Sequence, residues 1–249
     1  MTAPATQAIE KSLTLLSEIV ASDGRCSALA LADQEGLSRA TAHRILTALT
    51  RRGFLTRVGH GRYLAGPTFV RLAKHADFSR TLELAGRPVL KVLARDTGLT
   101  AHLGIFEGDM VTYLAKARGR RTELFTKEGM QLEAYCSGIG KMLLACLPKH
   151  EREIYLANGP FVSLTPHTII DPDSLRKELA KTRRRLYAFD DREIDADLRC
   201  LAVPVFDDDG AAIAALSIST RDADGPMKHL PRLRDAARTL EQKLYGQGD

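Results

Sequence analysis

Two serines near the C-terminus, Ser217 and Ser219, stand two residues apart in a stretch whose composition predicts a strand over residues 211–220. Successive side chains of a strand point to opposite faces, so the two hydroxyls share one face and the apolar Leu216 and Ile218 share the other. A pair of hydroxyls on one face suits hydrogen bonds to a small polar ligand. The alternative, that this face is exposed to solvent, stays open at the level of the sequence.

A second candidate is the segment Ser137-Gly138-Ile139-Gly140-Lys141, where a helix through Leu147 is predicted to begin with Ser137 as its cap. The first N–H groups of a helix have no partner within it, and glycine allows a ligand to approach them closely. Such a helix start therefore suits a carboxylate. The alternative is that these glycines serve only tight packing.

Cys136, just before this helix, supports a different hypothesis. A helix N-terminus lowers the pKa of a thiol, and the chain would then be a cysteine-dependent enzyme with Cys136 as its nucleophile. His102 or His167 would have to act as the base, and the spacing favours neither.

The common catalytic and metal-binding patterns are absent. Gly140-Lys141 does not end a phosphate loop, because Tyr135 and Met142 stand where glycine and Ser or Thr are required. The turn at residues 207–210 lacks the further acids of a calcium loop, and no GxSxG, HExxH or zinc-type cysteine pattern occurs. We therefore expect no catalytic residue, no metal site and no cofactor, and favour a protein that is not an enzyme.

The stretch from Ser38 to Arg52 predicts a helix that reads DNA, here named the recognition helix. Its apolar residues follow the i, i+3, i+4, i+7 spacing of a buried stripe, and Ser38 suits an N-cap. Polar side chains on the first turns can reach base edges, and the basic last turn can reach phosphate. A solvated polar face is the alternative. The candidate DNA contacts are Ser38, Arg39, Thr41, His43 and Arg44.

The neighbouring segments favour DNA binding. An apolar helical stripe over residues 9–20 and a short helix over 29–35 precede the recognition helix. Two short strands, 54–58 and 62–64, follow it around a glycine-rich turn. Three helices and a hairpin predict a winged helix-turn-helix domain over residues 1–66. Its wing carries Arg57, His60 and Arg62.

The rest of the chain predicts a linker helix over 67–78 and an α+β domain over 79–249. This domain is expected to begin with a helix over 82–96, broken or kinked near Gly86 and Pro88. Strands are predicted over 100–106, 110–117, 122–127, 187–190, 198–206 and 211–220, and helices over 137–147, 148–157, from 171 and over 233–244. Strands, then helices, then strands indicate a mostly antiparallel sheet of the GAF-like kind that senses small molecules.

Composition is that of an ordinary globular protein: 249 residues, 44% hydrophobic and 27% charged. No apolar run reaches the roughly 20 residues of a membrane span, and the N-terminus does not resemble a signal peptide, so we expect a cytoplasmic protein without a membrane partner. Residues 1–78 carry ten Lys or Arg and six Asp or Glu, whereas the remainder carries 26 and 25. Most of the net charge of +5 thus lies in the predicted DNA-binding part.

Four motifs together resemble the IclR family of bacterial transcriptional regulators, from about residue 7 to about residue 245. They are Ala40-Thr41-Ala42-His43-Arg44, Gly61-Arg62-Tyr63-Leu64, the segment 135–141, and Asp190-Asp191 followed by the segment 199–205. The resemblance implies a ligand-responsive regulator of a metabolic operon, of the catabolic kind. Its implied partners are a palindromic operator in double-stranded DNA, a small organic-acid effector, and further copies of the chain in a dimer or a dimer of dimers.

The resemblance also implies the positions of the effector pocket. Residues matching it are Asp190, Cys200, Ser217 and Ser219, with backbone around Gly138 and Ile139, and with Arg121 and Leu124 in its lining. Three of these side chains have a plainer alternative. Cys200 would be a small buried apolar residue, Asp190 a salt-bridged surface acid, and Arg121 part of a solvated basic loop.

Overall fold

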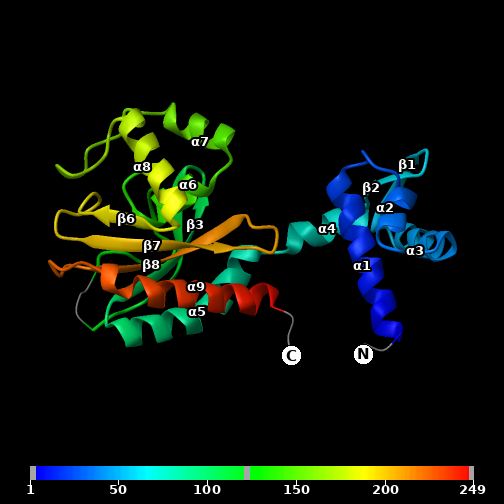
Figure 1. Cartoon of the computed structure of the whole chain (residues 1–249), viewed down its shortest axis with the longest axis horizontal. Coiled ribbons are helices and arrows are strands. Elements are labelled where there is room, and N and C mark those ends of the chain that lie inside the picture. The colour runs from blue at the N-terminus through cyan, green and yellow to red at the C-terminus, as the bar shows by residue number, and fades with distance from the viewer. Residues whose placement is uncertain (1–3, 121–123, 247–249) are drawn as a thin grey trace. The chain divides into compact units, whose positions relative to one another are not determined.

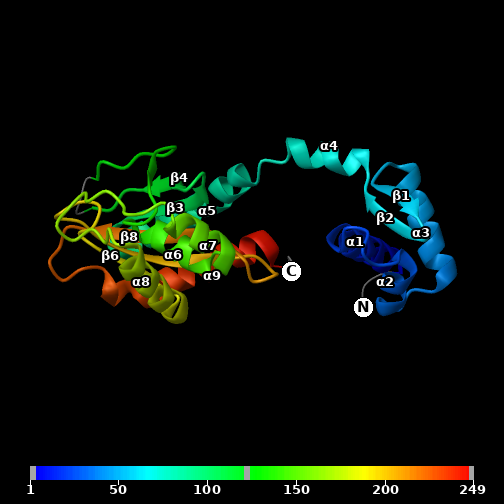
Figure 2. The same ribbon diagram turned by 90° about the horizontal axis from the view of Figure 1, so that it is seen from above.

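The computed structural model describes residues 4–120 and 124–246. Contacts divide the chain into two compact units, Met1–Asp77 and Phe78–Asp249 (Figures 1 and 2). Each unit has a hydrophobic core of its own. The first unit contains the elements α1 (Pro4–Ser22), α2 (Ala28–Gln34), α3 (Arg39–Arg51), β1 (Leu55–Gly59), β2 (Arg62–Ala65) and α4 (Pro67–His75). The predicted helix-turn-helix and its wing are confirmed.

Helix α3 begins where its capping residue predicts. The Ser38 hydroxyl accepts a hydrogen bond from the backbone N–H of Thr41 at 3.2 Å, which satisfies one of the free donors of the first turn. Ala42 and Leu46, from the apolar stripe, are buried in a core shared with α1, α2 and β1. The stripe thus holds α3 against the unit and leaves the polar face outward.

The wing is a two-stranded antiparallel hairpin with a tight turn. Gly59, His60 and Gly61 have φ angles of +112°, +46° and +71°, a region that glycine adopts freely and other residues seldom do. The carbonyl of Gly61 accepts a hydrogen bond from the N–H of Ala28 at 3.0 Å. This bond fixes the turn to the start of α2.

The helices after the wing differ from the prediction. The linker helix α4 ends at His75, and Phe78 is the first residue of α5 (Phe78–Thr97). Of the break or kink expected near Gly86 and Pro88, the break is wrong, because α5 is one continuous helix that contains both, and the kink stays a prediction. A Cβ at Gly86 would lie 2.5 Å from Cδ2 of Leu103, so this glycine serves close packing of the helix against the sheet.

The second unit is an α+β domain built on one antiparallel sheet. After α5 come β3 (Thr100–Glu107), β4 (Met110–Ala117), β5 (Gln131–Glu133), α6 (Gly138–Cys146), α7 (Lys149–Leu156), α8 (Pro172–Arg185), β6 (Ala188–Asp191), β7 (Arg199–Phe206), β8 (Ala212–Thr220), η1 (Met227–His229) and α9 (Leu230–Tyr245). The strand order is β5-β4-β3-β8-β7-β6, and all pairs are antiparallel. Helices α5 and α9 cover one face, and α6 covers the other with α7 and α8 beside it (Figure 1).

Along β6, β7 and β8 the two faces of the sheet differ in side-chain size. Toward α5 and α9 the strands present large residues such as Leu201 and Leu216, which form the main core. Toward α6 they present Ala188, Ala202 and Ala215. Small residues on this face leave α6 room to lie close to the strands.

The strand predicted over 122–127 is wrong in its described part, because Leu124–Lys127 is irregular. The ammonium of Lys116 donates hydrogen bonds to the carbonyls of Leu124 and Thr126 at 3.0 and 2.5 Å, so a side chain satisfies acceptors that a neighbouring strand would otherwise use. The strand that pairs with β4 on the side away from β3 is instead the short β5. In the described ranges, each helix is too short or too polar to cross a lipid bilayer.

Candidate functional site

A row of polar residues crosses four strands on the α6 face of the sheet. In the strand register, Asp190 of β6 stands opposite Cys200 of β7, Cys200 opposite Ser219 of β8, and Ser219 opposite Thr100 of β3. In the next row on this face, Ser217 stands opposite His102. The hydroxyl of Ser219 donates to the sulfur of Cys200 at 3.2 Å. The two serines therefore face the protein interior, and the solvent-facing alternative is wrong.

The N-terminus of α6 lies over this row. The Ser137 hydroxyl accepts from the N–H of Gly140 at 3.1 Å and caps the helix, as predicted. A Cβ at Gly138 would lie 3.3 Å from Cβ of Cys200, so the first turn sits directly on β7. A Cβ at Gly140 would overlap the backbone carbonyl of Ala134. Gly140 thus serves packing, and Gly138 brings the free helix start close to the polar row.

An enclosed cavity lies between the α6 start and the sheet, and we name it the effector pocket. Of the predicted pocket residues, Leu124, Gly138, Ile139, Asp190, Cys200, Ser217 and Ser219 all line it. Arg121 lies outside the described residues. The centre of a water-sized sphere can move within about 10 Å³ of this cavity, so the cavity has room for about one water molecule. A larger ligand must therefore move some of the lining apart.

Every strand of the sheet contributes to this lining. Side chains missed by the sequence interpretation as pocket residues include His102 of β3, Tyr113 of β4 and Leu132 of β5. Alternation within the strand predicted over 100–106 puts His102 on the same face as Thr100, but only the strand order shows that Ser217 is its neighbour. Sequence alternation gives the face of a residue and not its partner across the sheet.

Asp190 is fully buried, with one satisfied and one unsatisfied oxygen. Its Oδ1 accepts from the N–H of Glu193 at 2.8 Å, and Oδ2 has no hydrogen-bond partner among the described residues. Burial raises the pKa of Asp190 to about 7, against the opposing effects of the Lys141 charge, the Glu193 amide and the Cys200 thiol. The surface-acid alternative for Asp190 is therefore wrong.

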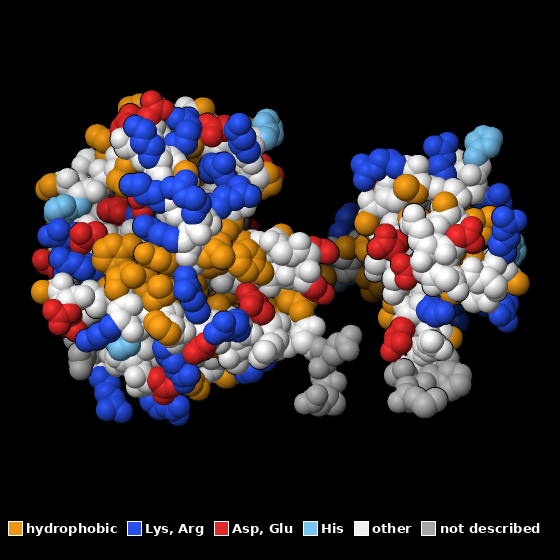
Figure 3. Space-filling view, in the orientation of Figure 1, with side chains coloured by type: hydrophobic (Ala, Val, Ile, Leu, Met, Phe, Trp, Pro, Cys, Tyr) orange, Lys and Arg blue, Asp and Glu red, His pale blue; other side chains and the backbone are white. Residues whose placement is uncertain are grey.

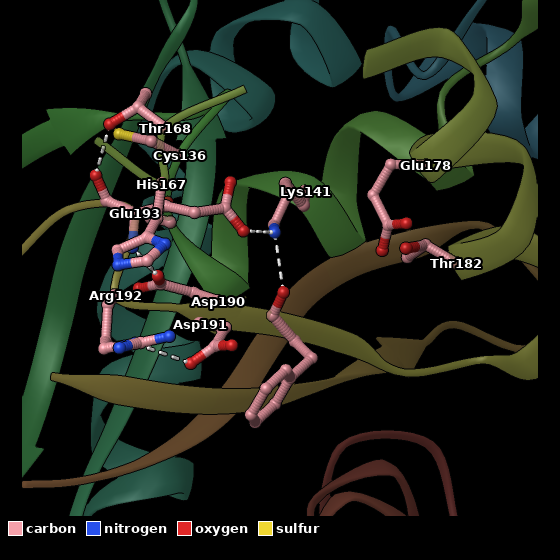
Figure 4. Close-up of polar contacts among 12 residues, drawn as sticks. Cys136, Lys141, His167, Thr168, Glu178, Thr182, Asp190, Asp191, Arg192 and Glu193 are labelled. Atoms are coloured by element: carbon pink, nitrogen blue, oxygen red, sulfur yellow. Dashed lines mark hydrogen bonds and ion pairs between the residues drawn. The ribbon is translucent and has the colours of Figure 1, made fainter. Parts of the chain in front are cut away.

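Behind Asp190 lies a buried ion pair that the sequence did not indicate. Lys141 of α6 is 1% exposed, and its ammonium contacts Oε1 of Glu193 and donates to the carbonyl of Phe189 at 2.6 Å (Figure 4). Oε2 of Glu193 has no partner in the described ranges, and burial raises the pKa of this carboxyl. The pair joins α6 to the turn that follows β6.

The turn after β6 is also held from a second segment. The Thr168 hydroxyl donates to the carbonyl of Glu193 at 2.7 Å (Figure 4). The Thr165 hydroxyl donates to the carbonyl of Arg192 at 2.6 Å. These bonds satisfy carbonyls of a non-helical turn in a buried place. Asp190, which begins this turn, is thereby held in position.

His102 is a neutral, buried imidazole at the opposite side of the polar row. Its Nε2 lies 2.8 Å from Oγ1 of Thr126, its ring packs on Tyr113 at 4.7 Å between centroids, and Nδ1 has no partner among the residues described. Burial, followed by the nearby charge of Lys116, lowers its pKa to about 3. His102 therefore carries no positive charge at neutral pH.

The enzyme alternative is wrong. Cys136 is fully buried, and burial raises the pKa of its thiol far above the ordinary value, so it is not the thiolate that a nucleophile requires. His102 is itself buried and neutral, while His167 is exposed. No cluster of three or more His, Cys, Asp or Glu suited to a metal ion occurs in the part of the chain that the structure describes.

In the first unit, the predicted DNA contacts lie on the outer side of α3 and on the wing. Seven of the eight predicted contacts are exposed, and Thr41 is half-buried, with its hydroxyl 2.9 Å from that of Ser38. A hollow between α1 and α3 is larger than the effector pocket but open and mainly apolar, and it also borders Arg44. The exposed side chains carry hydroxyl, imidazole and guanidinium groups, which can donate hydrogen bonds to base edges and phosphates.

The second unit has a near-neutral net charge, but its surface over α7 and α8 is basic. Lys and Arg side chains crowd over α7 and α8 in Figure 3, and the exposed ones on α8 include Lys177, Lys181, Arg183 and Arg184. The two acids of this helix are already engaged, Asp173 by Arg176 and Glu178 by Arg185. Three arginines in the last turn also suit the negative end of the helix dipole.

Comparison with known proteins identifies this two-unit arrangement. Residues 79–244 match the family model described as the bacterial transcriptional regulator IclR C-terminal domain, and residues 8–59 match the IclR helix-turn-helix domain. The chain belongs to the IclR family. It is accordingly a DNA-binding transcription regulator with a C-terminal effector-binding domain, and it is not an enzyme.

Individual relatives agree with this assignment. The chain is 34% identical over 212 residues to the uncharacterized HTH-type transcriptional regulator RhmR of Escherichia coli, covering 85% of this chain and 81% of that protein. It is 33% identical over 225 residues to the transcriptional repressor IclR of the same organism, covering 88% and 82%. The crystal structure of Thermotoga maritima IclR matches with a TM-score of 0.61 at 28% identity, covering 97% of this chain and 100% of that one.

Proposed function

We propose that this IclR-family regulator controls a metabolic, catabolic operon in the cytoplasm, and that a small organic acid in the effector pocket sets its affinity for DNA. The observation that carries the proposal is the meeting of the α6 start with the polar row of the sheet in an enclosed cavity. Helix N–H groups and the buried Ser217 hydroxyl supply hydrogen bonds to a carboxylate, and the Ser219 hydroxyl can do so by exchanging its bond to Cys200 for one to the ligand. The two parts of the protein are then a reader of DNA and a sensor of a metabolite.

The DNA-binding role is assigned to eight residues in two groups. Side chains at the start of α3 contact base edges in the major groove, and the wing side chains contact phosphate. The base-reading group is Ser38, Arg39, Thr41, His43 and Arg44, and the wing group is Arg57, His60 and Arg62. Two copies in a dimer, or four in a dimer of dimers, would read a palindrome whose half-sites lie about 34–36 Å apart.

Substitution of one arginine from each group tests this assignment. Arg44→Ala is expected to weaken binding to the operator by about 1–3 kcal/mol and to affect random DNA much less, because a base contact is lost. Arg62→Ala is expected to weaken binding to both DNAs and to reduce the salt dependence, because a phosphate contact is lost. Gel shifts at two salt concentrations on both DNAs measure this, with the exposed Lys91→Ala on α5 as the control. Equal losses on both DNAs for Arg44→Ala would exclude base reading by that residue.

The sensing role is tested in the effector pocket. The double variant Ser217→Ala, Ser219→Ala removes two buried hydroxyls and one hydrogen bond to Cys200. It is expected to abolish the response of DNA binding to the effector while leaving the affinity for DNA unchanged. A response that survives in the double variant would place the effector elsewhere.

A further inference from the structure

The buried groups beside the effector pocket are unbalanced in charge. Lys141 is one cation, whereas Asp190 and Glu193 are two carboxyls, and all three are less than one-tenth exposed. Each carboxyl keeps one oxygen without a hydrogen-bond partner among the described residues, Oδ2 of Asp190 and Oε2 of Glu193. A buried, unpaired charge is costly, so this cluster lacks one proton or one positively polarised group.

The groups that face Asp190 do not supply the missing charge. From α6 comes Lys141, whose ammonium is already on Glu193, and from β7 and β4 come the neutral Cys200 and Tyr113. Cys136, before α6, is a neutral thiol, and His102 of β3 is a neutral imidazole. Among the described residues that line the pocket there is no Lys or Arg.

An anionic ligand would make the imbalance worse unless a proton came with it. A carboxylate held by the first N–H groups of α6, at Gly138 and Ile139, shares the pocket with Asp190. Two carboxylates in one dry site cannot both remain charged without a large cost. If Asp190 is protonated, its O–H becomes a donor for the ligand, and one buried negative charge disappears.

We propose that the effector pocket takes up its ligand as a small carboxylate anion together with one proton from solvent, and that Asp190 holds this proton and donates it in a hydrogen bond to the ligand. The inference rests on the proposed function, since it concerns the same pocket. Because the pKa of Asp190 is about 7, the ligand-free protein already carries this proton at pH 6. At and above neutral pH the proton must be taken up when the ligand binds. The affinity for the acid therefore falls by up to about tenfold for each pH unit above 7.

The test compares acids with amides of the same shape. The full-length protein is titrated by calorimetry with acetate and with benzoate, and with acetamide and benzamide, at pH 6 and pH 8 at constant ionic strength. Titration in two buffers of different ionisation enthalpy counts the protons taken up. Asp190→Asn, which resembles the protonated acid, and Asp208→Asn, an exposed acid in the β7–β8 turn, are measured alongside.

Binding of a carboxylate with uptake of nearly one proton at pH 8, and a Kd lower at pH 6, supports the proposal. Asp190→Asn should then bind the acid with no pH dependence, while Asp208→Asn behaves as the wild type. Binding without proton uptake, a preference for the amides, or no binding of either acid at 50 mM and pH 6 would overturn it. The proton count uses the wild type, so it holds even if Asp190→Asn is unstable.

These outcomes are separate from the proposed function. If neither acid binds but operator binding persists and responds to another compound, the regulator is established and only the acid-plus-proton inference fails. If Arg121 supplies a cation to the ligand, the acids bind with no proton uptake, and the inference fails in the same way. If the operator is not preferred over random DNA, the proposed function itself fails.

Discussion

At the scale of single residues, Lys141 shows how much of a buried site depends on one charge. The helix start at residues 137–141 was recognisable in the sequence, but lysine in its first turn gave no sign of burial, since lysine is almost never fully buried unless paired. Its partner Glu193 lies 52 positions away, in a turn with no recognisable motif. The pair could be found only from the three-dimensional contact.

Replacing Lys141 by Met should strongly destabilise the fold. The change leaves the buried Glu193 without its cation, and we expect a loss of about 3–5 kcal/mol in the free energy of unfolding at pH 8. Lys141 lowers the pKa of Glu193 against the effect of burial, so without it that pKa rises further and the loss is smaller at pH 5, where the acid is more readily protonated. Urea denaturation at both pH values measures this. Lys149→Met, at an exposed site, should change stability by less than about 0.5 kcal/mol.

Asp190 should itself make the protein less stable as the pH rises. Its pKa is about 7 in the folded protein and near 3.8 when unfolded, so between these values the folded state binds more protons and its stability falls with increasing pH. Asp190→Asn should remove this fall. The variant should gain stability relative to wild type between pH 4 and pH 8, by roughly 4 kcal/mol at most. A stability difference between the two proteins that stays constant with pH would show that Asp190 does not titrate in this range.

At the scale of elements, helix α6 is positioned by two glycines with different tasks. Gly140→Ala should displace the helix from the backbone at Ala134 and cost about 1–3 kcal/mol in the free energy of unfolding. Gly138→Ala meets Cβ atoms at 3.3 and 3.5 Å and the Cys200 carbonyl oxygen at 3.7 Å, so it should keep the fold but narrow the effector pocket and weaken ligand binding. Thermal unfolding and calorimetric titration of both variants distinguish the two tasks. Equal stability losses would contradict the distinction.

Most elements could be predicted from the sequence because their signals are local. The caps at Ser38, Ser137 and Asp171 each accept the hydrogen bond that their position implies. The errors lie where a distant partner decides the outcome. Lys116 satisfies the backbone around Leu124–Thr126 with its side chain, and β5, only three residues long, is a strand because β4 lies beside it.

The residues themselves indicated two parts of the effector pocket, the serine pair and the helix start at residues 137–141, and the rest was predictable only through the family resemblance. Its residues lie between positions 102 and 219, and their meeting depends on the order of six strands. Periodicity put Ser217 and Ser219 on one face, but it could not show that this face lies under α6 and not in water. The family resemblance indicated Asp190 and Cys200. Neither periodicity nor the resemblance indicated that His102 lines the pocket or that Lys141 is buried beside it.

At the scale of the whole molecule, the two units must be coupled if the effector is to control DNA binding. An effector changes DNA affinity only if it binds more tightly to one of two arrangements of the protein. Linkage then requires reciprocity: the factor by which a bound effector changes the Kd for operator equals the factor by which bound operator changes the Kd for effector. Titrating effector with and without operator present measures both factors. Unequal factors at equilibrium would indicate a further binding site.

The contribution of all six strands to the lining of the effector pocket has a mechanical consequence. The outermost strands, β5 and β6, take part through Leu132 and Asp190, and such peripheral strands ordinarily open most easily. A ligand bound in the pocket would contact the edge strands and the central strands together. Amide hydrogens of residues 131–133 and 188–191 should therefore exchange more slowly once it is bound. The effector-binding domain would then respond to the metabolite by becoming more rigid, as much as by moving.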